Sequence, residues 1–242
     1  MAKFAVYYVP PAEDELYRLG TSVLGYDVRK GKDVPTILED PETSPGFPEA
    51  WIGKARHYGF HLTIGDAIDF HLFDILTIEQ EIKDLLNCFN PDHKFTLTRR
   101  EHDFVSFRGP AVVLGYEAND HLKILHAVIA TRIHLLGTGS GYFERHLSDP
   151  SKGAGRPHRL HRTRKFFSPT ILDSYFPHFT VLRAYPGKAN DPQVTRFFCD
   201  QFQTFSKIEV GSICLLLQMN EGENWRIHKE FKRESFPESF PS

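Results

Sequence analysis

Two short segments of the chain share one pattern, a histidine and a threonine separated by a single apolar residue. They are His61-Leu62-Thr63 and His178-Phe179-Thr180, and their histidines lie 117 residues apart. Each triplet follows an irregular stretch, opens a strand-like segment and precedes a helix and further strands. This repeated order predicts an α+β fold with two pseudo-symmetric lobes, whose antiparallel sheets carry helices on their outer faces and leave a central cleft.

The rest of the pattern fits one bilobal domain spanning residues 1–242. A helix is expected to begin near Pro11, and a capping box of Thr77 and Gln80 is expected to begin another. Asn119 or Asp120 should begin a third helix. We expect strands at residues 4–9, 60–70, 94–98, 104–107, 111–116, 179–184, 208–218 and 225–231, and helices at 11–24, 75–89, 122–136 and 193–205. Residues 25–50 and 137–169 are predicted as long loops, the second of them basic, and residues 235–242 as a loose tail.

Composition narrows the classes of protein to which the chain can belong. Hydrophobic residues make up 40% of it, which is enough for a packed core. The formal net charge is -2, so any affinity for nucleic acid must be local. The three cysteines, Cys88, Cys199 and Cys214, are widely spaced, which is typical of a reducing compartment. With no apolar run long enough to span a bilayer, these features predict a cytoplasmic protein.

The two triplets carry groups suited to phosphate chemistry. Successive side chains of a strand point to opposite faces, so the histidine and threonine of each triplet share a face. Threonine hydroxyls can donate to phosphate oxygens, and a histidine can give or take a proton near neutral pH. We therefore predict that His61 and His178 act as acid and base, in either order, while Thr63 and Thr180 hold the phosphate. The competing interpretation is two ordinary strand histidines bonded to nearby backbone.

Residues around the triplets are candidates for binding the rest of a substrate. Tyr58 and Tyr175 could stack against a base, and Arg183 could neutralise phosphate charge, although its odd offset from His178 disfavours the same face. A dense basic stretch precedes the second triplet and could contact RNA or could simply be solvated; it comprises Arg156, Arg159, Arg162, Arg164 and Lys165. No metal-binding motif or phosphate-binding glycine loop is present, so we expect neither a metal nor a cofactor.

Several of these segments resemble the 2H phosphoesterase superfamily. The run Phe176-Pro177-His178-Phe179-Thr180-Val181-Leu182-Arg183 is similar to the second motif of its 2′-5′ RNA ligase-like branch. Tyr58-Gly59-Phe60-His61-Leu62-Thr63 looks like the first motif of the branch linked to phosphonate metabolism, as do the opening Phe4-Ala5-Val6-Tyr7-Tyr8-Val9-Pro10-Pro11 and Leu24-Gly25-Tyr26-Asp27. The resemblance implies a bilobal α+β fold with both motifs in a central cleft.

Two functions follow as hypotheses. The first is metal-independent hydrolysis of a cyclic phosphodiester, 2′,3′- or ribose 1,2-cyclic, or of a 2′-5′ phosphodiester, by two-histidine acid–base catalysis on a small cyclic nucleotide or an RNA end. The alternative is a nucleotide- or RNA-binding module that uses the same cleft without turnover.

Overall fold

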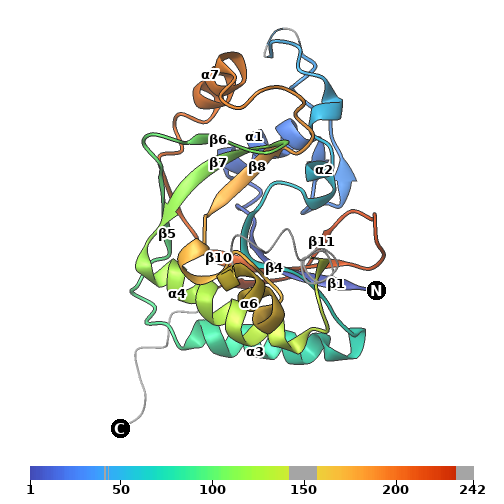
Figure 1. Ribbon diagram of the computed structural model, residues 1–242, viewed down its shortest axis with the longest axis vertical. Helices are drawn as coiled ribbons and strands as arrows, with labels where there is room; N and C mark the ends of the chain where they lie inside the picture. Colours follow the sequence, from blue (N-terminus) through green and yellow to red (C-terminus); the bar gives the residue numbers. More distant parts are fainter. Residues whose placement is uncertain (41, 43, 142–156, 233–242) are drawn as a thin grey trace.

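The computed structural model describes residues 1–40, 42, 44–141 and 157–232 of the chain (Figure 1). Most strands lie on one hydrogen-bonded path that runs β11-β10-β1-β4-β8-β7-β5-β9, and β6 pairs with β7 beside it. All these pairings are antiparallel, and a small hairpin of β2 and β3 stands apart. The α+β class predicted from the sequence is confirmed, with one continuous curled sheet as its centre.

The strands are β1 (Lys3–Tyr8), β2 (Tyr26–Asp27), β3 (Lys32–Asp33), β4 (Leu62–Asp69), β5 (Thr96–Arg99), β6 (Val105–Arg108), β7 (Ala111–Ala118), β8 (His178–Leu182), β9 (Lys207–Glu209), β10 (Ser212–Gln218) and β11 (Arg226–Lys232). The α-helices of the described residues are α1 (Glu15–Leu24), α2 (Ala55–Tyr58), α3 (Ile75–Asn87), α4 (Asp120–Val128), α6 (Pro157–Phe166) and α7 (Pro192–Gln201).

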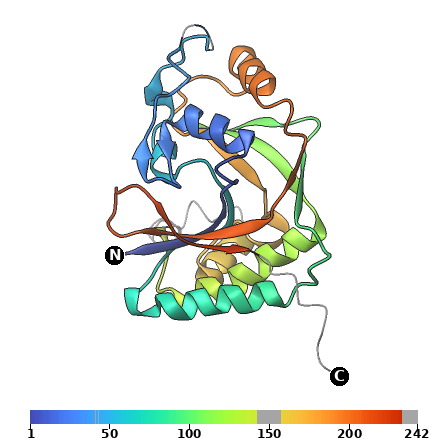
Figure 2. The same ribbon diagram turned by 180° about the vertical axis from the view of Figure 1, so that it is seen from behind.

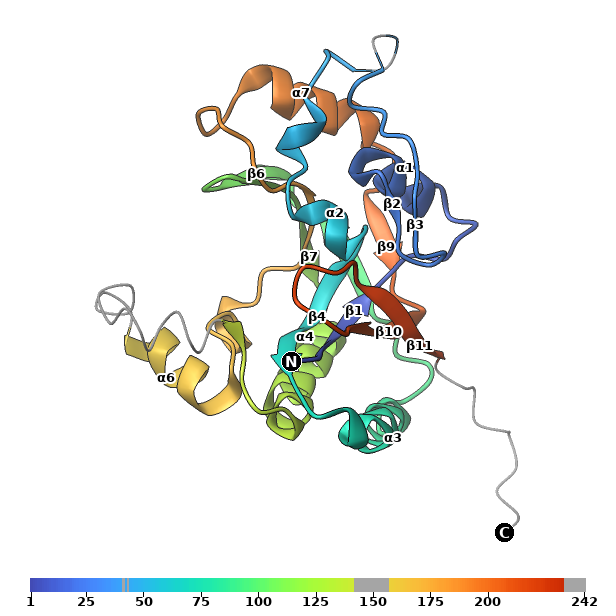
Figure 3. The same ribbon diagram turned by 90° about the vertical axis from the view of Figure 1, so that its right-hand side faces the viewer.

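The helices gather at two ends of the molecule with the sheet between them. Helices α1, α2 and α7 lie at one end, and α3, α4 and α6 at the other (Figures 1 and 3). Seen from behind, α3 and α4 run side by side beneath β1, β10 and β11 (Figure 2). Among the described helices, none is both long and apolar enough to cross a bilayer.

Side-chain caps explain where several helices begin. Asn119 accepts a hydrogen bond from the backbone N–H of Leu122 and begins α4, as the sequence predicts. The predicted start of α1 at Pro11 is wrong, because Asp14 caps the helix three residues later. The capping box is also wrong: α3 begins at Ile75, before Thr77. After Val128, the chain of α4 continues as a π-helical turn and a short 3-10 helix up to Leu136.

The long loop predicted at residues 137–169 needs correction. Residues 157–166 form α6, a ten-residue helix whose only buried member is Thr163. Because almost no apolar residue recurs on one face of this segment, its sequence carries no helical period. The remaining part of this loop at 142–156, like the tail at 235–242, lies outside the described residues.

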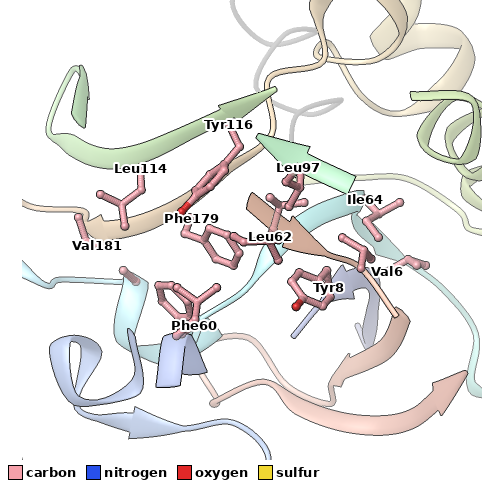
Figure 4. Close-up of a cluster of buried hydrophobic side chains, with 14 of the residues drawn as sticks. Val6, Tyr8, Phe60, Leu62, Ile64, Leu97, Leu114, Tyr116, Phe179 and Val181 are labelled. Carbon is pink, nitrogen blue, oxygen red and sulfur yellow. The ribbon is translucent and has the colours of Figure 1, made fainter. Parts of the chain in front are cut away.

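The core beneath the sheet is built around the strands that carry the two triplets. Leu62 and Ile64 of β4 and Phe179 and Val181 of β8 are fully buried in one apolar cluster (Figure 4). The rings of Phe60 and Phe179 stack with centroids 4.6 Å apart and planes inclined by 7°. Burial of these side chains fixes which face of each strand points inward, so the alternate residues must point the other way.

Gly20 of α1 allows this aromatic stack to form, because a Cβ atom there would lie 2.2 Å from the Phe60 ring. We expect Gly20→Ala to lower the free energy of unfolding by about 1–3 kcal/mol, since overpacking outweighs the better helix propensity of alanine. Urea unfolding measures this effect. Gly211→Ala is the control, because nothing lies within 4 Å of its Cβ position. Equal stability of the two variants would contradict the packing argument.

Candidate active site

The two triplets lie side by side at the centre of the sheet. Strands β4 and β8 are antiparallel neighbours, and Leu62 stands opposite Phe179. The same register sets His61 opposite Thr180 and Thr63 opposite His178. Since Leu62 and Phe179 point into the core, the four polar side chains project from the other face, where all four are half-buried. Residues opposite each other on one face have Cβ atoms roughly 5 Å apart, so the groups converge on one small area.

Both histidines are held by the same local hydrogen bond. The Nδ1 atom of His61 donates to the carbonyl of Gly59 over 2.8 Å, and that of His178 donates to the carbonyl of Phe176 over 2.7 Å. A carbonyl can only accept, so Nδ1 carries the proton in each neutral ring and Nε2 is left as an acceptor. Gly59 reaches this geometry with φ of 68°, a conformation that favours glycine.

Aromatic rings limit how the histidines can move. The Tyr7 ring stacks on His61 with centroids 4.0 Å apart, and Phe176 stacks on His178 at 5.5 Å. The predicted ligand-stacking residue Tyr58 lies beside His61, at 5.9 Å between centroids, but also packs on Trp225. Stacking of Tyr58 on a substrate base remains a prediction.

Burial and nearby positive charge disfavour protonation of the site histidines. Burial, together with the charges of His178 and Arg183, lowers the pKa of His61 to about 4. Burial also lowers the pKa of His178, as do Arg183 and Arg108, whereas Asp66 raises it. Arg183 can act on both rings despite its offset because β8 ends at Leu182, so strict alternation no longer applies to it.

The other predicted stacking residue, Tyr175, connects the two triplets. Its hydroxyl donates to the carbonyl of Thr63 over 3.0 Å, and its ring stacks on His126 with centroids 3.7 Å apart and an angle of 8°. His126 in turn is bonded through Nδ1 to the carbonyl of Ile64 at 2.7 Å. One face and the hydroxyl of Tyr175 are therefore occupied by protein, which favours a structural role over base stacking.

A half-buried acid lies next to this connection. Asp66 of β4 accepts a hydrogen bond from the hydroxyl of Ser168, and burial raises the pKa of its carboxyl group. Three residues near the histidines are not predicted as site residues from the sequence: Asp66, Tyr7 and Arg108. Alternation along β4 would place Asp66 on the core face with Leu62 and Ile64, and the pairing of β4 with β1 is irregular near this residue. The closeness of Arg108 to His178 follows only from the register of β6, β7 and β8.

The basic stretch divides into exposed and bonded side chains. Arg162 donates to the carbonyl of Ile171 and to the hydroxyl of Ser174, and it pairs with Asp173. Arg159 is half-buried, and Arg156 lies outside the described residues. The side chains left exposed on α6 are His158, His161, Arg164 and Lys165. Only part of the predicted RNA contact is thus available at the surface of α6.

In the part of the chain that is described, no three histidine, cysteine, aspartate or glutamate side chains gather closely enough to hold a metal ion. The sequence matches no model of a known protein family, and no curated protein is significantly similar to it.

The link through Tyr175 can be tested by removing one atom. Tyr175→Phe leaves the carbonyl of Thr63 without its donor, and we expect the free energy of unfolding to fall by about 1 kcal/mol. Tyr58→Phe is the matched control, a half-buried tyrosine stacked on its neighbours. Chemical denaturation of both variants makes the comparison. An equal loss in the two would show that the Tyr175 hydroxyl is not a specific brace.

Buried histidines should make the fold sensitive to acid. His134 is 0% exposed, donates through Nδ1 to the carbonyl of Phe166 over 3.1 Å, and has its pKa lowered by burial to about 4. Below pH 6.5 this histidine is protonated in the unfolded chain but stays neutral in the folded chain until the pH approaches 4. The free energy of unfolding therefore decreases as the pH falls, by about 3 kcal/mol at pH 4 for this group.

We therefore expect His134→Asn, which keeps a donor near Nδ1, to reduce the loss of stability between pH 6.5 and pH 4. Unfolding free energies measured across this range test it, with exposed His71→Asn as the control. An unchanged pH dependence in the His134 variant would contradict the assignment.

Proposed function

We propose that this protein is a metal-independent phosphodiesterase that hydrolyses cyclic or 2′-5′ phosphodiester bonds with two histidines. The observation that carries the proposal is the pairing of Leu62 with Phe179, which sets both His-x-Thr triplets on one face in opposite directions. In-line cleavage needs a base and an acid on opposite sides of phosphorus, and two antiparallel triplets supply one histidine on each side. The resemblance to the 2H phosphoesterases, with their two lobes and central cleft, agrees with this reaction.

In this reaction the attacking water gives its proton to Nε2 of one neutral histidine while its oxygen bonds to phosphorus. The other histidine, protonated, gives a proton to the departing ribose oxygen as the P–O bond breaks. Thr63 and Thr180 donate to the two non-bridging oxygens, and Arg183 offsets their charge. Proton exchange with solvent then returns each histidine to its starting protonation state for the next cycle.

The surroundings of the two rings favour His61 as the base and His178 as the acid. His61 has its pKa lowered to about 4 by burial, so it is neutral at physiological pH and can accept a proton. His178 is the ring whose pKa Asp66 raises, and a bound phosphodiester anion would raise it further. Protonation of His178 also opposes protonation of His61, so the two rings favour opposite states.

A binding module without turnover is the second candidate. The observation in its favour is the exposed face of α6, where His158, His161, Arg164 and Lys165 are accessible and no acidic residue interrupts the helix. Such a surface suits contact with RNA phosphates, whose affinity would fall with added salt. Tight binding of RNA with no product after long incubation would favour this candidate over hydrolysis.

The test is hydrolysis of 2′,3′-cyclic nucleotides, ribose 1,2-cyclic phosphate and a 2′-5′-linked dinucleotide in excess chelator. We expect His61→Ala and His178→Ala each to lose about 100- to 10,000-fold in kcat. Thr63→Val and Thr180→Val should weaken substrate binding, while Thr→Ser at either position should retain it. Full activity of either alanine variant would refute the two-histidine mechanism.

The pH dependence of kcat/KM provides an independent check. Activity requires neutral His61 and protonated His178, so it should rise as pH increases through about 4 and fall as His178 loses its proton. Because burial lowers the pKa of His178 from its ordinary value of 6.5, the optimum should lie below pH 6.5. A profile that rises continuously to alkaline pH would contradict these roles.

A further inference from the structure

A second cation lies on the same face of the sheet as the two triplets. Residues opposite each other on neighbouring strands share a face, and the register pairs His178 with Gly115 and Thr180 with Val113. Val113 is paired in turn with Ser106 of β6. Arg108 lies two residues after Ser106 on the same strand, so it shares this face as well. The row of side chains therefore runs from β4 across β8 and β7 to Arg108.

The residues between Arg108 and the triplets are small. On this face β7 presents Ala111, Val113 and Gly115, and a Cβ atom at Gly115 would lie 3.0 Å from the Phe176 ring. Neighbouring strands are separated by about 4.8 Å, so the backbones of β6 and β8 lie roughly 10 Å apart. The long side chain of Arg108 spans part of this distance toward β8.

The position of Arg108 is fixed by Phe176. The guanidinium carbon of Arg108 lies 4.2 Å from the centre of the Phe176 ring, and that ring stacks on His178. The side chain is exposed, and within the described residues it forms no ion pair. Arg100 offers a contrast, because it lies 5.3 Å from the same ring but is paired with Asp103 and Glu117.

An exposed arginine that is held by a ring and lacks a carboxylate partner retains its capacity to bind an anion. A cyclic phosphodiester carries a single negative charge. In the proposed reaction the two threonines and Arg183 already bind and neutralise that charge. A further cation on the same face implies a further anionic group. The electrostatic effect of Arg108 on the pKa of His178 agrees with its closeness to the site.

We propose that Arg108 binds a second phosphate of the substrate, adjacent to the phosphodiester that is cleaved. This inference rests on the proposed function and narrows its substrate class to nucleotides or RNA ends that carry two neighbouring phosphates. The second phosphate is either a 5′-phosphate on the same nucleoside or the next phosphate along an RNA chain. Both present the planar pair of oxygens that a guanidinium group recognises.

Three substrates separate these possibilities: adenosine 2′,3′-cyclic phosphate, its 5′-phosphorylated form, and a diadenosine dinucleotide that ends in the cyclic phosphate. We expect KM to be about 10- to 100-fold lower for a substrate with the second phosphate. Arg108→Gln should remove this difference, measured as the ratio of the kcat/KM values with and without the second phosphate at one pH, because the charge lost near His178 affects all three substrates alike. Arg100→Gln, on the same ring, should retain it. A preference confined to the dinucleotide identifies the RNA backbone, and one for the 5′-phosphorylated nucleotide identifies the mononucleotide.

A binding measurement keeps this inference separate from the proposed reaction. Calorimetry with adenosine 3′,5′-bisphosphate and adenosine 3′-monophosphate needs no turnover, and only the wild type and Arg100→Gln should prefer the bisphosphate. Arg108-dependent preference without any hydrolysis would support the second phosphate site and refute the phosphodiesterase. Hydrolysis without any preference for a second phosphate in either assay would overturn the role of Arg108 and leave the two-histidine reaction standing. An equal effect of Arg108→Gln on all substrates would also overturn it.

Discussion

The contact between β4 and β8 is the constraint on which the rest of the site depends. These strands join the part of the sheet formed by β1, β10 and β11 to the part formed by β5, β7 and β9, with Leu62 opposite Phe179. Because this pairing is short, few backbone hydrogen bonds support it. Side-chain contacts must therefore define its register. The Phe60–Phe179 stack does so on the core side, and the bond from Tyr175 to the carbonyl of Thr63 does so near the polar face. A slip by one residue would send the histidines into the core.

This arrangement also explains why apolar residues matter to a polar site. Each histidine is bonded through Nδ1 to a carbonyl two residues earlier, which leaves Nε2 available, and each ring is stacked on an aromatic neighbour. Fixed rings lose little conformational freedom when a ligand binds, which is an advantage for proton transfer along a defined line. The aromatic residues Tyr7 and Phe176 thus orient the two histidine rings without taking part in proton transfer.

Local features could be predicted from the sequence, whereas long-range register could not. Alternation within each triplet predicts that its histidine and threonine share a face, and the spacing of apolar residues identifies most helices and strands. The helix at 157–166 cannot be predicted in this way, because α6 buries only Thr163 and so lacks an apolar face. Arg108 and Asp66 were missed for a different reason. Their closeness to His178 depends on which strands pair and in what register, and no periodicity within one strand carries that information.

In the proposed reaction, the charge on this face makes protonation of His178 depend on a bound anion. Burial and the positive charges of Arg108 and Arg183 lower the pKa of His178 and so oppose its protonation. An anion placed between the triplets reverses this balance, because its charge favours protonation of the nearest ring. Proton uptake and phosphate binding are then linked, and each must strengthen the other. The acid needed to protonate the leaving oxygen would thus form mainly in the complex, when a substrate is present to receive its proton.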